Sequence, residues 1–498
     1  MIYDLLSSFG DMLSPTPFLF ILLGTLSGIV IGAIPGLNGA MLVTLSLPLT
    51  YGWDPLNAIG LLVGQYVGSI SGGLVSATLL NIPGSPSSMM TTLDAAPMAK
   101  KGNPERALQL GIIASFVGGT VSWLALVFLS PPLAKIALSF GPHEYFALVL
   151  VALMLISSLS EGSMAKALMS ACLGMLVAFP GLDTITAQPR LTFGFPQMLA
   201  GFDLLAVLLG IFAVTQLLTD AGNSMASAER IRLSGKMYFV ALSDLSKQAF
   251  NMVRSSLIGT WIGILPGIGG SVGSIVSYVT AKNMSKTPEK FGTGCDEGVV
   301  ASEAANNATV GGALIPMITM GIPGSIIDVI LIAALTLHNI RPGPLLFQNE
   351  PHIVYGFMST MMIANILMLF IMIFGIRLLA KLIDVPTKFL VPILLLLCVV
   401  GAFAVNNRVF DIWVMLGFGL VGLLFRSWSI PVAPFVIGFI LTPIAETNFR
   451  TALILSDNNL WDFFARPITA MFLVLSAVML LIPLFKRRRP AITTRNEH

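Results

Sequence analysis

One motif, an apolar run broken by Pro-Gly, occurs twice in this chain. The first copy, Gly28–Gly39, reads G-I-V-I-G-A-I-P-G-L-N-G, and the second, Gly259–Gly270, reads G-T-W-I-G-I-L-P-G-I-G-G, at an offset of 231 residues (259 − 28 = 231). A further motif follows each copy, N-I-P-G-S at Asn81–Ser85 and G-I-P-G-S at Gly321–Ser325, at an offset of 240 residues (323 − 83 = 240). The repetition predicts an internal duplication, which constrains the fold more than any single motif does.

Each copy also contains a glycine pair between its two motifs. We align Gly72-Gly73 with Gly311-Gly312, at an offset of 239 residues (311 − 72 = 239), so the order is kept with short insertions. Small residues in apolar helices are typical of close helix packing. We expect close packing along the helices and exposed backbone at the breaks.

Apolar runs of membrane-spanning length make up most of the chain. Of its 498 residues 55% are hydrophobic and 10% are charged, against about 25% charged in an average soluble protein. The runs lie at 17–34, 56–80, 110–129, 145–159, 204–218, 355–379, 389–405 and 412–425. Because about 20 apolar residues match the hydrocarbon core of a bilayer, we predict an all-α polytopic membrane protein with roughly ten to twelve transmembrane helices.

The basic residues predict the orientation in the membrane. The net charge is only +3, so no nucleic-acid partner is indicated. Basic residues favour cytoplasmic segments, and here they gather at 100–106, 230–254, 282–290 and in the tail 486–489. The N-terminal segment contains Asp4 and Asp11 but no basic residue before its first apolar run. We therefore predict a periplasmic N-terminus and a cytoplasmic C-terminus.

The charges also suggest that the two repeats are inverted. After the first motif, the first copy has no basic residue in Tyr51–Pro55, whereas the second has three lysines in Ala281–Lys290. After the second motif the bias reverses, because Lys100–Arg106 is basic and the second copy has only Arg341 there. Equivalent loops on opposite sides are typical of inverted-repeat transporters. The predicted division is a first repeat (1–225), a cytoplasmic linker (226–255), a second repeat (256–465) and an extra C-terminal helix with a basic tail (466–498).

Four Pro-Gly breaks interrupt apolar segments, two in each repeat. Inside a bilayer, broken backbone is tolerated only where it packs in protein or lines a cavity. Its free N–H groups bind anions and its free carbonyls bind cations, so paired breaks point to the midplane binding site of a transporter. Ordinary kinks or close helix crossings are the alternative, which a single break would favour more than four in register. The breaks are Pro35-Gly36, Pro83-Gly84, Pro266-Gly267 and Pro323-Gly324.

Glycines, prolines and polar residues beside the breaks are the candidates for binding substrate carboxylates through backbone N–H groups, amides and hydroxyls. In the first repeat they are Gly36, Asn38, Gly39, Ser69, Ser71, Asn81, Pro83, Gly84 and Ser85. In the second repeat they are Asn306, Asn307, Thr309, Pro323, Gly324 and Ser325.

A cation site is predicted in the second repeat. Glu303 shares a helix face with Asn306 and Asn307 because the spacings are three and four residues. A carboxylate with two amides suits a hard cation such as Na⁺, and an acid inside a membrane is a functional candidate. The alternative is a polar patch at a helix end, near Cys295–Glu297. The candidate cation ligands are Gly267, Gly269, Gly270, Glu303 and Asn306.

Other chemistries are not indicated. Cys172, Cys295 and Cys398 stand alone, without the spacing of metal ligands, so neither a disulfide framework nor a metal site is predicted. The nucleotide-binding pattern G-x-x-x-x-G-K-[ST] does not occur, and no nucleophile lies in a recognisable pattern with a base. We predict a protein that is not an enzyme and has no cofactor apart from a coupling ion.

The motif strings resemble the large membrane subunit of the tripartite tricarboxylate transporter family over nearly the whole chain. The strings that carry the resemblance are Ile34–Gly39, Asn81–Ser85, Leu93–Gly102, Arg190–Gly194, Phe291–Gly298, Ala304–Ala308, Gly321–Ser325 and Pro431–Pro434, with Glu446. The resemblance implies a permease of the bacterial cytoplasmic membrane that imports a di- or tricarboxylate, driven by a Na⁺ or H⁺ gradient. It also implies a periplasmic substrate-binding protein and a small membrane subunit as partners, paired re-entrant hairpins, and an elevator-like movement.

Two alternatives to this function are open on the sequence. One is a stand-alone secondary carrier, or a channel, that needs no binding protein. The other is an intramembrane enzyme, which the lack of a nucleophile and base pair disfavours. The two copies also differ chemically at their tips, because Gly269 stands where the first copy has Asn38. One tip could therefore favour an anion and the other a cation.

Overall fold

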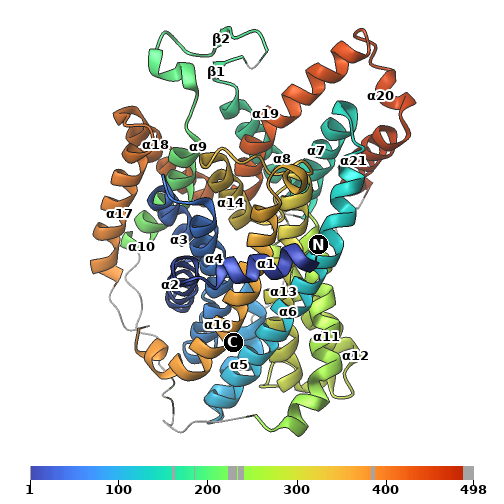
Figure 1. Ribbon diagram of the computed structural model, residues 1–498. Coiled ribbons are helices and arrows are strands. Elements are labelled where there is room, and N and C mark those ends of the chain that lie inside the picture. Colours follow the sequence, from blue (N-terminus) through green and yellow to red (C-terminus); the bar gives the residue numbers. More distant parts are fainter. Residues whose placement is uncertain are drawn as a thin grey trace, which may run out of the picture.

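The computed structural model is almost entirely helical (Figure 1) and describes residues 2–159, 163–183, 185–222, 231, 233, 240–267, 269–382 and 387–485. The first half contains α1 (Ile2–Met12), α2 (Pro15–Ala33), α3 (Gly39–Ser46), α4 (Pro55–Leu79), α5 (Met89–Lys100), α6 (Pro104–Ala137), α7 (Pro142–Leu159), α8 (Met164–Ala178), α9 (Leu204–Leu208) and α10 (Thr215–Gly222). Between them lie the short helices η1 (Leu47–Thr50), η2 (Pro86–Ser88), η3 (Pro196–Ala200) and η4 (Leu209–Val214), and an antiparallel strand pair, β1 (Gly181–Leu182) and β2 (Pro189–Arg190).

The second half is also helical. It contains α11 (Leu242–Ile264), α12 (Gly269–Met284), η5 (Pro288–Lys290), α13 (Asp296–Met320), α14 (Ile326–Leu337), α15 (Leu346–Asn349), α16 (Pro351–Leu382), α17 (Thr387–Ala404), α18 (Val409–Ser427), α19 (Val432–Leu455), α20 (Asp462–Ala465) and α21 (Pro467–Phe485). Part of the predicted linker (226–230, 232 and 234–239) and the basic tail after 485 lie outside the described residues.

The surface of the helices fits a lipid environment. Six described helices, α2, α4, α6, α16, α18 and α19, are long and apolar enough to cross a membrane. On α16, Phe370, Phe374 and Leu378 follow one another at four-residue spacing and are 53%, 64% and 64% exposed. A stripe of this kind is rare on a soluble monomer but matches hydrocarbon. The prediction of an all-α polytopic membrane protein is confirmed.

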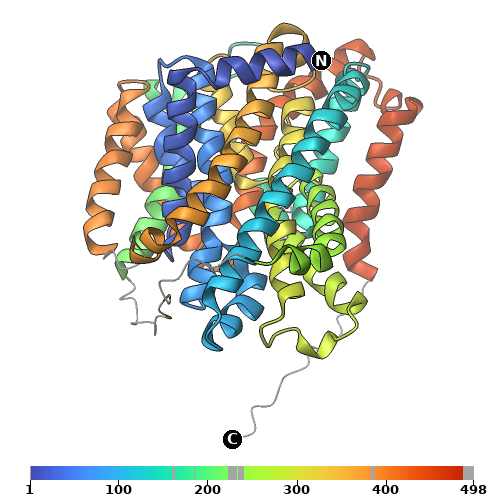
Figure 2. The ribbon, with the colours of Figure 1, turned by 60° about the horizontal axis from the view of Figure 1, so that its bottom comes forward.

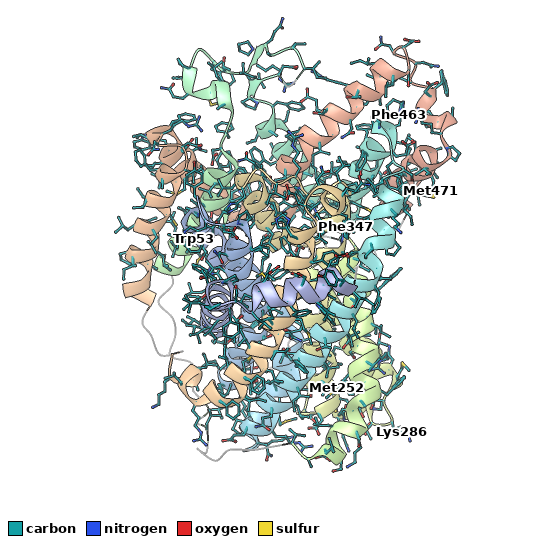
Figure 3. All side chains as sticks on the ribbon, viewed as in Figure 1. Trp53, Met252, Lys286, Phe347, Phe463 and Met471 are labelled. Atoms are coloured by element: carbon teal, nitrogen blue, oxygen red, sulfur yellow. The ribbon has the colours of Figure 1, made fainter. Side chains whose placement is uncertain are left out.

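Most helices run between two ends of the molecule, and α1 lies across one of them (Figure 2). The strand pair β1–β2 projects at the top of Figure 1, whereas α5, α11 and α12 reach the bottom. Among the labelled side chains, Met252 and Lys286 lie at the bottom of the view and Phe463 near the top (Figure 3). Where α6, α11 and α13 begin, Arg106 pairs with Asp244 at 3.1 Å and with Asp296 at 2.5 Å.

In the first half, α2 and α4 pack backbone to backbone and run in the same direction. A Cβ on Gly28 would lie 2.5 Å from the carbonyl oxygen of Gln65, and one on Gly32 would lie 2.3 Å from that of Ser69. Only glycine allows this approach. Because the residue numbers rise together along both helices, the chain between them must return, and α3 and η1 provide the return. The segments α2 and α3 therefore form a helical hairpin with its tip at the first Pro-Gly break.

The second half repeats this hairpin with α11, α12 and α13. A Cβ on Gly259 would lie 2.2 Å from the carbonyl oxygen of Ala305, and one on Gly263 would lie 2.5 Å from that of Thr309. These contacts are the counterparts of those in the first half at offsets of 231 and 240 residues. The α11–α12 tip therefore corresponds to the α2–α3 tip in its packing as well as in its sequence.

The backbone at the breaks also repeats. At the first motif, Gly36 and Gly267 have φ values of +91° and +73°. At the second motif, Asn81 and Gly321 have φ values of +57° and +72°, and Asn and Gly are the residues that tolerate this left-handed region best. The tight turns, rather than the helices around them, explain why these positions carry these residues.

The alignment of the glycine pairs is wrong by one residue. Gly72 meets the carbonyl oxygen of Ile29, and Gly312 meets that of Thr260, which is 231 residues after Ile29. The structural partner of Gly72 is therefore Gly312, at the offset of 240 that holds for the following motif. Ala313 then corresponds to Gly73. The alignment was wrong because it compared residue types alone, and adjacent glycines cannot be told apart in that way.

Candidate functional site

Four helical segments begin close together in the middle of the molecule, and they are interleaved between the two halves. A Cβ on Gly39, at the start of α3, would touch Ser69 of its own half and lie 3.3 Å from Ile327 at the start of α14. A Cβ on Gly270, at the start of α12, would lie 3.2 Å from Thr309 of its own half and 2.9 Å from Ser87 in η2, which leads into α5. The tip of each hairpin thus packs against the second break of the other half.

This arrangement gathers free backbone donors. The first turn of a helix has N–H groups without intrahelical partners, and the helix dipole adds a partial positive charge there. In three of the four segments side chains occupy such donors. Asn38 Oδ1 accepts from the N–H of Met41 at 2.8 Å, and Ser325 Oγ accepts from the N–H of Asp328 at 3.3 Å. At η2, Ser85 and Ser88 form a capping box in which Ser88 Oγ accepts from the N–H of Ser85 at 3.2 Å. Gly269 has no side chain with which to cap α12. The start of α12 is therefore the place where backbone donors are best able to bind an external anion.

Asn306 lies beside the start of α12 with its amide group unpartnered. The residue is fully buried, and among the described residues neither its Nδ2 nor its Oδ1 has a hydrogen-bond partner. A Cβ on Gly270 would lie 2.8 Å from Asn306 Oδ1, which places the amide against the α11–α12 tip. A buried amide without partners costs about 1–3 kcal/mol, so this group is suited to bind a ligand.

Hydroxyl groups lie next to this amide. The Oγ atoms of Ser85 and Ser87 are 2.8 Å apart, and Ser274 of α12 donates to the carbonyl oxygen of Ser87 at 2.9 Å. Thr309 donates to the backbone oxygen of Asn306 at 2.6 Å. The cluster of Asn306, Ser85, Ser87 and the start of α12, which we call the amide cluster, is polar and carries no charged side chain of its own.

The two long central helices are joined beside this cluster. Ser71 of α4 donates to Asn307 Oδ1 of α13 at 2.6 Å, and Asn307 Nδ2 donates to the backbone oxygen of Glu303 at 3.1 Å. Asn307 therefore has partners at both ends of its amide, unlike its neighbour Asn306. With a rise of 1.5 Å per residue, Asn306 lies roughly 15 Å from the start of α13, near the middle of a bilayer.

Glu303 has different neighbours from the two asparagines. Its carboxylate accepts hydrogen bonds from Thr91 of α5 at 2.5 Å and from Ser115 of α6 at 3.1 Å. Asn307 faces α4, and Asn306 faces the tip of α12. The three residues share the predicted face of α13, but their polar groups contact three different parts of the protein.

The glycines of the breaks hold the turns together. Gly267 donates its N–H to the carbonyl oxygen of Gly324 at 2.9 Å, which ties the two breaks of the second half to each other. A Cβ on Gly84, after Pro83, would lie 2.3 Å from the carbonyl oxygen of Gly32. Gly36 lies in the turn after α2, Pro323 lies between α13 and α14, and Gly269 begins α12. Asn81 lies in an exposed turn after α4, outside the amide cluster.

Two residues that the sequence analysis did not single out lie at the other half of the centre. Asp328, in the first turn of α14, is fully buried, and neither carboxylate oxygen has a hydrogen-bond partner among the described residues. The hydroxyl of Tyr66, on α4, lies 2.8 Å from Ser325 Oγ. The signal was present as an acid three residues after Ser325 in an otherwise apolar run, but the same pattern marks an ordinary helix start.

A large open cavity lies at the end of α13 that is remote from Arg106. Its volume is about 1010 Å³, and Met320, Ile332 and Thr336 bring it next to α13 and α14. Arg341 is the one charged residue among the described residues that line it. The cavity is thus mostly apolar, with a single positive charge among the described residues of its lining.

Arg190, from the motif string Arg190–Gly194, and Glu446 meet near the β1–β2 segment in a network of ion pairs. Arg190 pairs with Glu446 at 2.5 Å and with Asp183 at 3.2 Å, and Arg450 pairs with Asp183 at 2.8 Å. The backbone N–H groups of Thr186 and Ile185 hold the pKa of the Asp183 carboxyl well below its usual range, and Arg450 adds to the effect. This network fastens the β1–β2 segment to α19.

These features define a polytopic membrane protein whose centre consists of broken helices, an architecture found in membrane transporters. A family model described as "Tripartite tricarboxylate transporter TctA family" matches residues 18–437, and the chain belongs to that family. The family is one of transporters and not an enzyme class, and its members are the large subunits of tripartite tricarboxylate transporters.

Two relatives from Agrobacterium vitis are similar to the chain. The "uncharacterized 52.8 kDa protein in TAR-I ttuC' 3'region" is 32% identical over 498 residues, which cover 99% of this chain and 98% of the relative. The "uncharacterized protein in TAR-II ttuC' 3'region" is 33% identical over 226 residues, which cover 45% of this chain and 93% of the relative. No solved structure matches the chain.

Proposed function

We propose that this chain is the permease subunit that moves a di- or tricarboxylate across the bacterial cytoplasmic membrane, driven by a gradient of Na⁺ or H⁺. A periplasmic binding protein would deliver the substrate, and a small membrane subunit would accompany the chain. The observation that carries the proposal is the amide cluster, in which an unpartnered buried amide meets the start of α12. Amide N–H groups, hydroxyls and a helix N-terminus are donors to a carboxylate.

In this proposal the substrate carboxylate binds between Asn306 and the start of α12, with Ser85 and Ser87 as further donors. Ser69, Ser71, Asn307 and Thr309 contribute by holding α4, α13 and the two tips in place. The start of α3 and Ser325, on the other side of α4 and α13, are the equivalent positions in the other half. The coupling cation would bind at a buried carboxylate near the breaks, where Glu303 is the residue predicted from sequence.

The proposed transport involves inverted repeats and an elevator-like movement. The direction of the two central helices supports inversion, because α4 and α13 begin at opposite ends of the molecule. Helix α13 begins beside Arg106, whereas α4 begins near His338, at the end of α14, and ends at Leu79. The hairpin tips then enter the membrane from opposite sides and meet at the centre. The cavity with Arg341 is the entrance that we propose for an anion arriving from the periplasm.

Uptake into proteoliposomes tests this function. The vesicles would contain this chain with its small subunit, and a panel of labelled di- and tricarboxylates would be offered with and without the binding protein, under imposed Na⁺ or H⁺ gradients. We expect uptake that requires the binding protein and one of the gradients. Uptake that is indifferent to the binding protein would indicate a stand-alone carrier, and flux that follows only the gradient of the substrate would indicate a channel.

A further inference from the structure

The buried carboxylate of Asp328 has neither an ion-pair partner nor a hydrogen bond of good geometry among the described residues. Desolvating an ionised carboxylate costs several kcal/mol after relaxation, unless a charge or hydrogen bonds compensate. The nearest donors to its two oxygens, the Ser325 hydroxyl and the N–H groups of Gly324 and Ser325, compensate the burial of Asp328 only in part. The group is therefore stable in this position when it carries a proton or holds a small cation.

On the described helices that pack against α14, no other charged group competes for this position. The helices α3 and α9, which pack against α14, contain no titratable side chain, and α4 contributes only Tyr66. The titratable residues on the other neighbours, α13 and α19, bond elsewhere. On α13, Asp296 pairs with Arg106, and Glu303 accepts hydrogen bonds from Thr91 and Ser115. Glu297 lies beside Asp296 in the first turn of α13, at the opposite end of this helix from Met320. On α19, Glu446 and Arg450 pair with the β1–β2 segment.

The surroundings of Asp328 supply oxygen ligands. Its N–H donates to Ser325 Oγ at 3.3 Å, and that atom lies 2.8 Å from the hydroxyl of Tyr66. Hydroxyl and carboxylate oxygens are the ligands that hard cations prefer. The start of α14 alone would attract an anion, so a carboxylate at this place changes the preference of the site from anion to cation.

The comparison of the two halves shows why the site differs from the amide cluster. The position of Tyr66 in the first half corresponds to Asn306 in the second, and Asp328 corresponds to Ser88, at the offset of 240 residues. Ser88 Oγ donates to the backbone oxygen of Ser85 at 2.9 Å and is fully satisfied within its own turn. One half thus offers a neutral amide and hydroxyls, and the other a buried acid.

We propose that Asp328, beside Ser325 and Tyr66, takes up the coupling cation, H⁺ or Na⁺, while the amide cluster holds the substrate carboxylate. This inference rests on the proposed function and adds the place at which the gradient acts. Because α3 and α14 pack together, occupation of Asp328 would neutralise a negative charge close to the tips and so favour the arrival of an anionic substrate. The affinities for cation and carboxylate are then linked, and each raises the other by the same factor.

The linkage can be measured directly as binding of labelled citrate and succinate to the purified chain with its small subunit. Affinity is compared in NaCl and in choline chloride at constant pH, and at pH 6 and pH 8 at constant Na⁺. We expect Na⁺ or acid to raise the affinity of the native chain by about tenfold or more, equivalent to about 1.4 kcal/mol. A response to Na⁺ at constant pH identifies Na⁺ as the cation, and a response to pH alone identifies H⁺.

The substitution Asp328→Asn keeps the shape of the side chain and removes its charge. We expect it to abolish the dependence on both cations, so that the affinity ratio falls to about one. Asp328→Ser is the second variant, because Ser88 shows that the equivalent turn accommodates serine. The matched control is Asp411→Asn, since Asp411 on α18 is equally buried but paired with Arg408, directly before that helix. We expect it to keep the native ratio.

An Asp328 variant that retains the native cation dependence would overturn the inference. So would a loss of dependence in Glu303→Gln that is absent from Asp328→Asn, because it would place the cation at the other acid. A native chain that binds carboxylate without any cation dependence would also contradict the inference but leave the substrate site standing. A native chain that binds no carboxylate would instead contradict the proposed function.

Discussion

Ser71 donates a hydrogen bond to Asn307 across 2.6 Å, and these residues are 236 positions apart in the chain. The bond joins α4 to α13 where both helices are buried, next to the tips of the two hairpins. It also leaves Asn306, the neighbouring amide, free to face the start of α12. One asparagine of the pair thus connects the two halves and the other is available to a ligand.

The Ser71–Asn307 bond is expected to stabilise the fold. Ser71→Ala and Asn307→Ala should each lower the free energy of unfolding by about 1–3 kcal/mol, because each leaves a buried polar group without its partner. The double variant should cost less than the sum of the two single variants by about 0.5–3 kcal/mol. Thermal unfolding in detergent measures this coupling, with the exposed Ser139→Ala as a control. Simple additivity would show that the bond contributes nothing.

Gly270 should tolerate no side chain without loss of transport. In Gly270→Ala the new Cβ would lie 2.8 Å from Asn306 Oδ1 and 2.9 Å from Ser87, so the amide cluster must widen. We expect uptake to fall by about tenfold or more, at an overpacking cost of about 1–3 kcal/mol in stability. Gly417→Ala, on a helix with nothing within 4 Å of the new atom, should leave uptake unchanged. Equal uptake in the two variants would contradict the proposed position of the substrate.

Asp94 should be needed for stability rather than for substrate binding. Its Oδ1 accepts from the N–H groups of Gly292, Gly294 and Cys295 at 2.8–3.0 Å, and its Oδ2 accepts from Tyr278 at 2.7 Å. Asp94→Ala should therefore cost about 3 kcal/mol or more, whereas Tyr278→Phe, which loses one bond of four, should cost about 1–2 kcal/mol. Thermal unfolding of the two variants measures the difference. Equal costs would show that the loop before α13 does not depend on this carboxylate.

The β1–β2 segment should stay attached to α19 over the neutral and mildly acidic range. The pKa of Asp183 is lowered in the folded state by the N–H groups of Thr186 and Ile185. A carboxyl with a lowered folded pKa contributes stability that is complete above its ordinary value of 3.8 and is lost only as the pH falls below it. Hydrogen exchange of the Ile185 and Thr186 amides should therefore show equal protection at pH 8 and pH 5.

Asp183→Asn is the control for that experiment, because it removes the charge at every pH. We expect it to lower the protection of both amides at pH 8 as well as at pH 5. If protection in the native chain declined between pH 8 and pH 5, a group other than Asp183 would hold the segment.

The fold could be predicted from the sequence where its rules are local. Pro35-Gly36 and Pro266-Gly267 interrupt apolar helices, and a break in hydrocarbon must be packed in protein, so both tips were found. The alignment of Gly72-Gly73 with Gly311-Gly312 was less accurate, because these residues are alike in type. Only the contacts show that Gly72, rather than Gly73, corresponds to Gly312.

The site could be predicted only in part, since it depends on contacts between segments far apart. Helical spacing places Glu303, Asn306 and Asn307 on one face, but spacing does not reveal that three different elements take up their polar groups. Asp328 escaped notice because its environment comes from α3 and α4, which are far away in the sequence; Tyr66 is 262 residues from it (328 − 66 = 262). A buried acid is recognised by the partners it lacks, and these are visible only in the fold.

The central claim is that the substrate carboxylate binds at Asn306, and Asn306→Asp tests it most directly. The substitution keeps the shape of the side chain but replaces the two donors of the amide with an acid, whereas Asn365→Asp introduces the same change at another buried amide, on α16. Calorimetry of citrate and succinate binding to the purified chain gives the affinities. We predict that Asn306→Asp weakens binding by about a hundredfold, close to 3 kcal/mol, and that Asn365→Asp leaves it unchanged. Native affinity in folded Asn306→Asp would contradict the account.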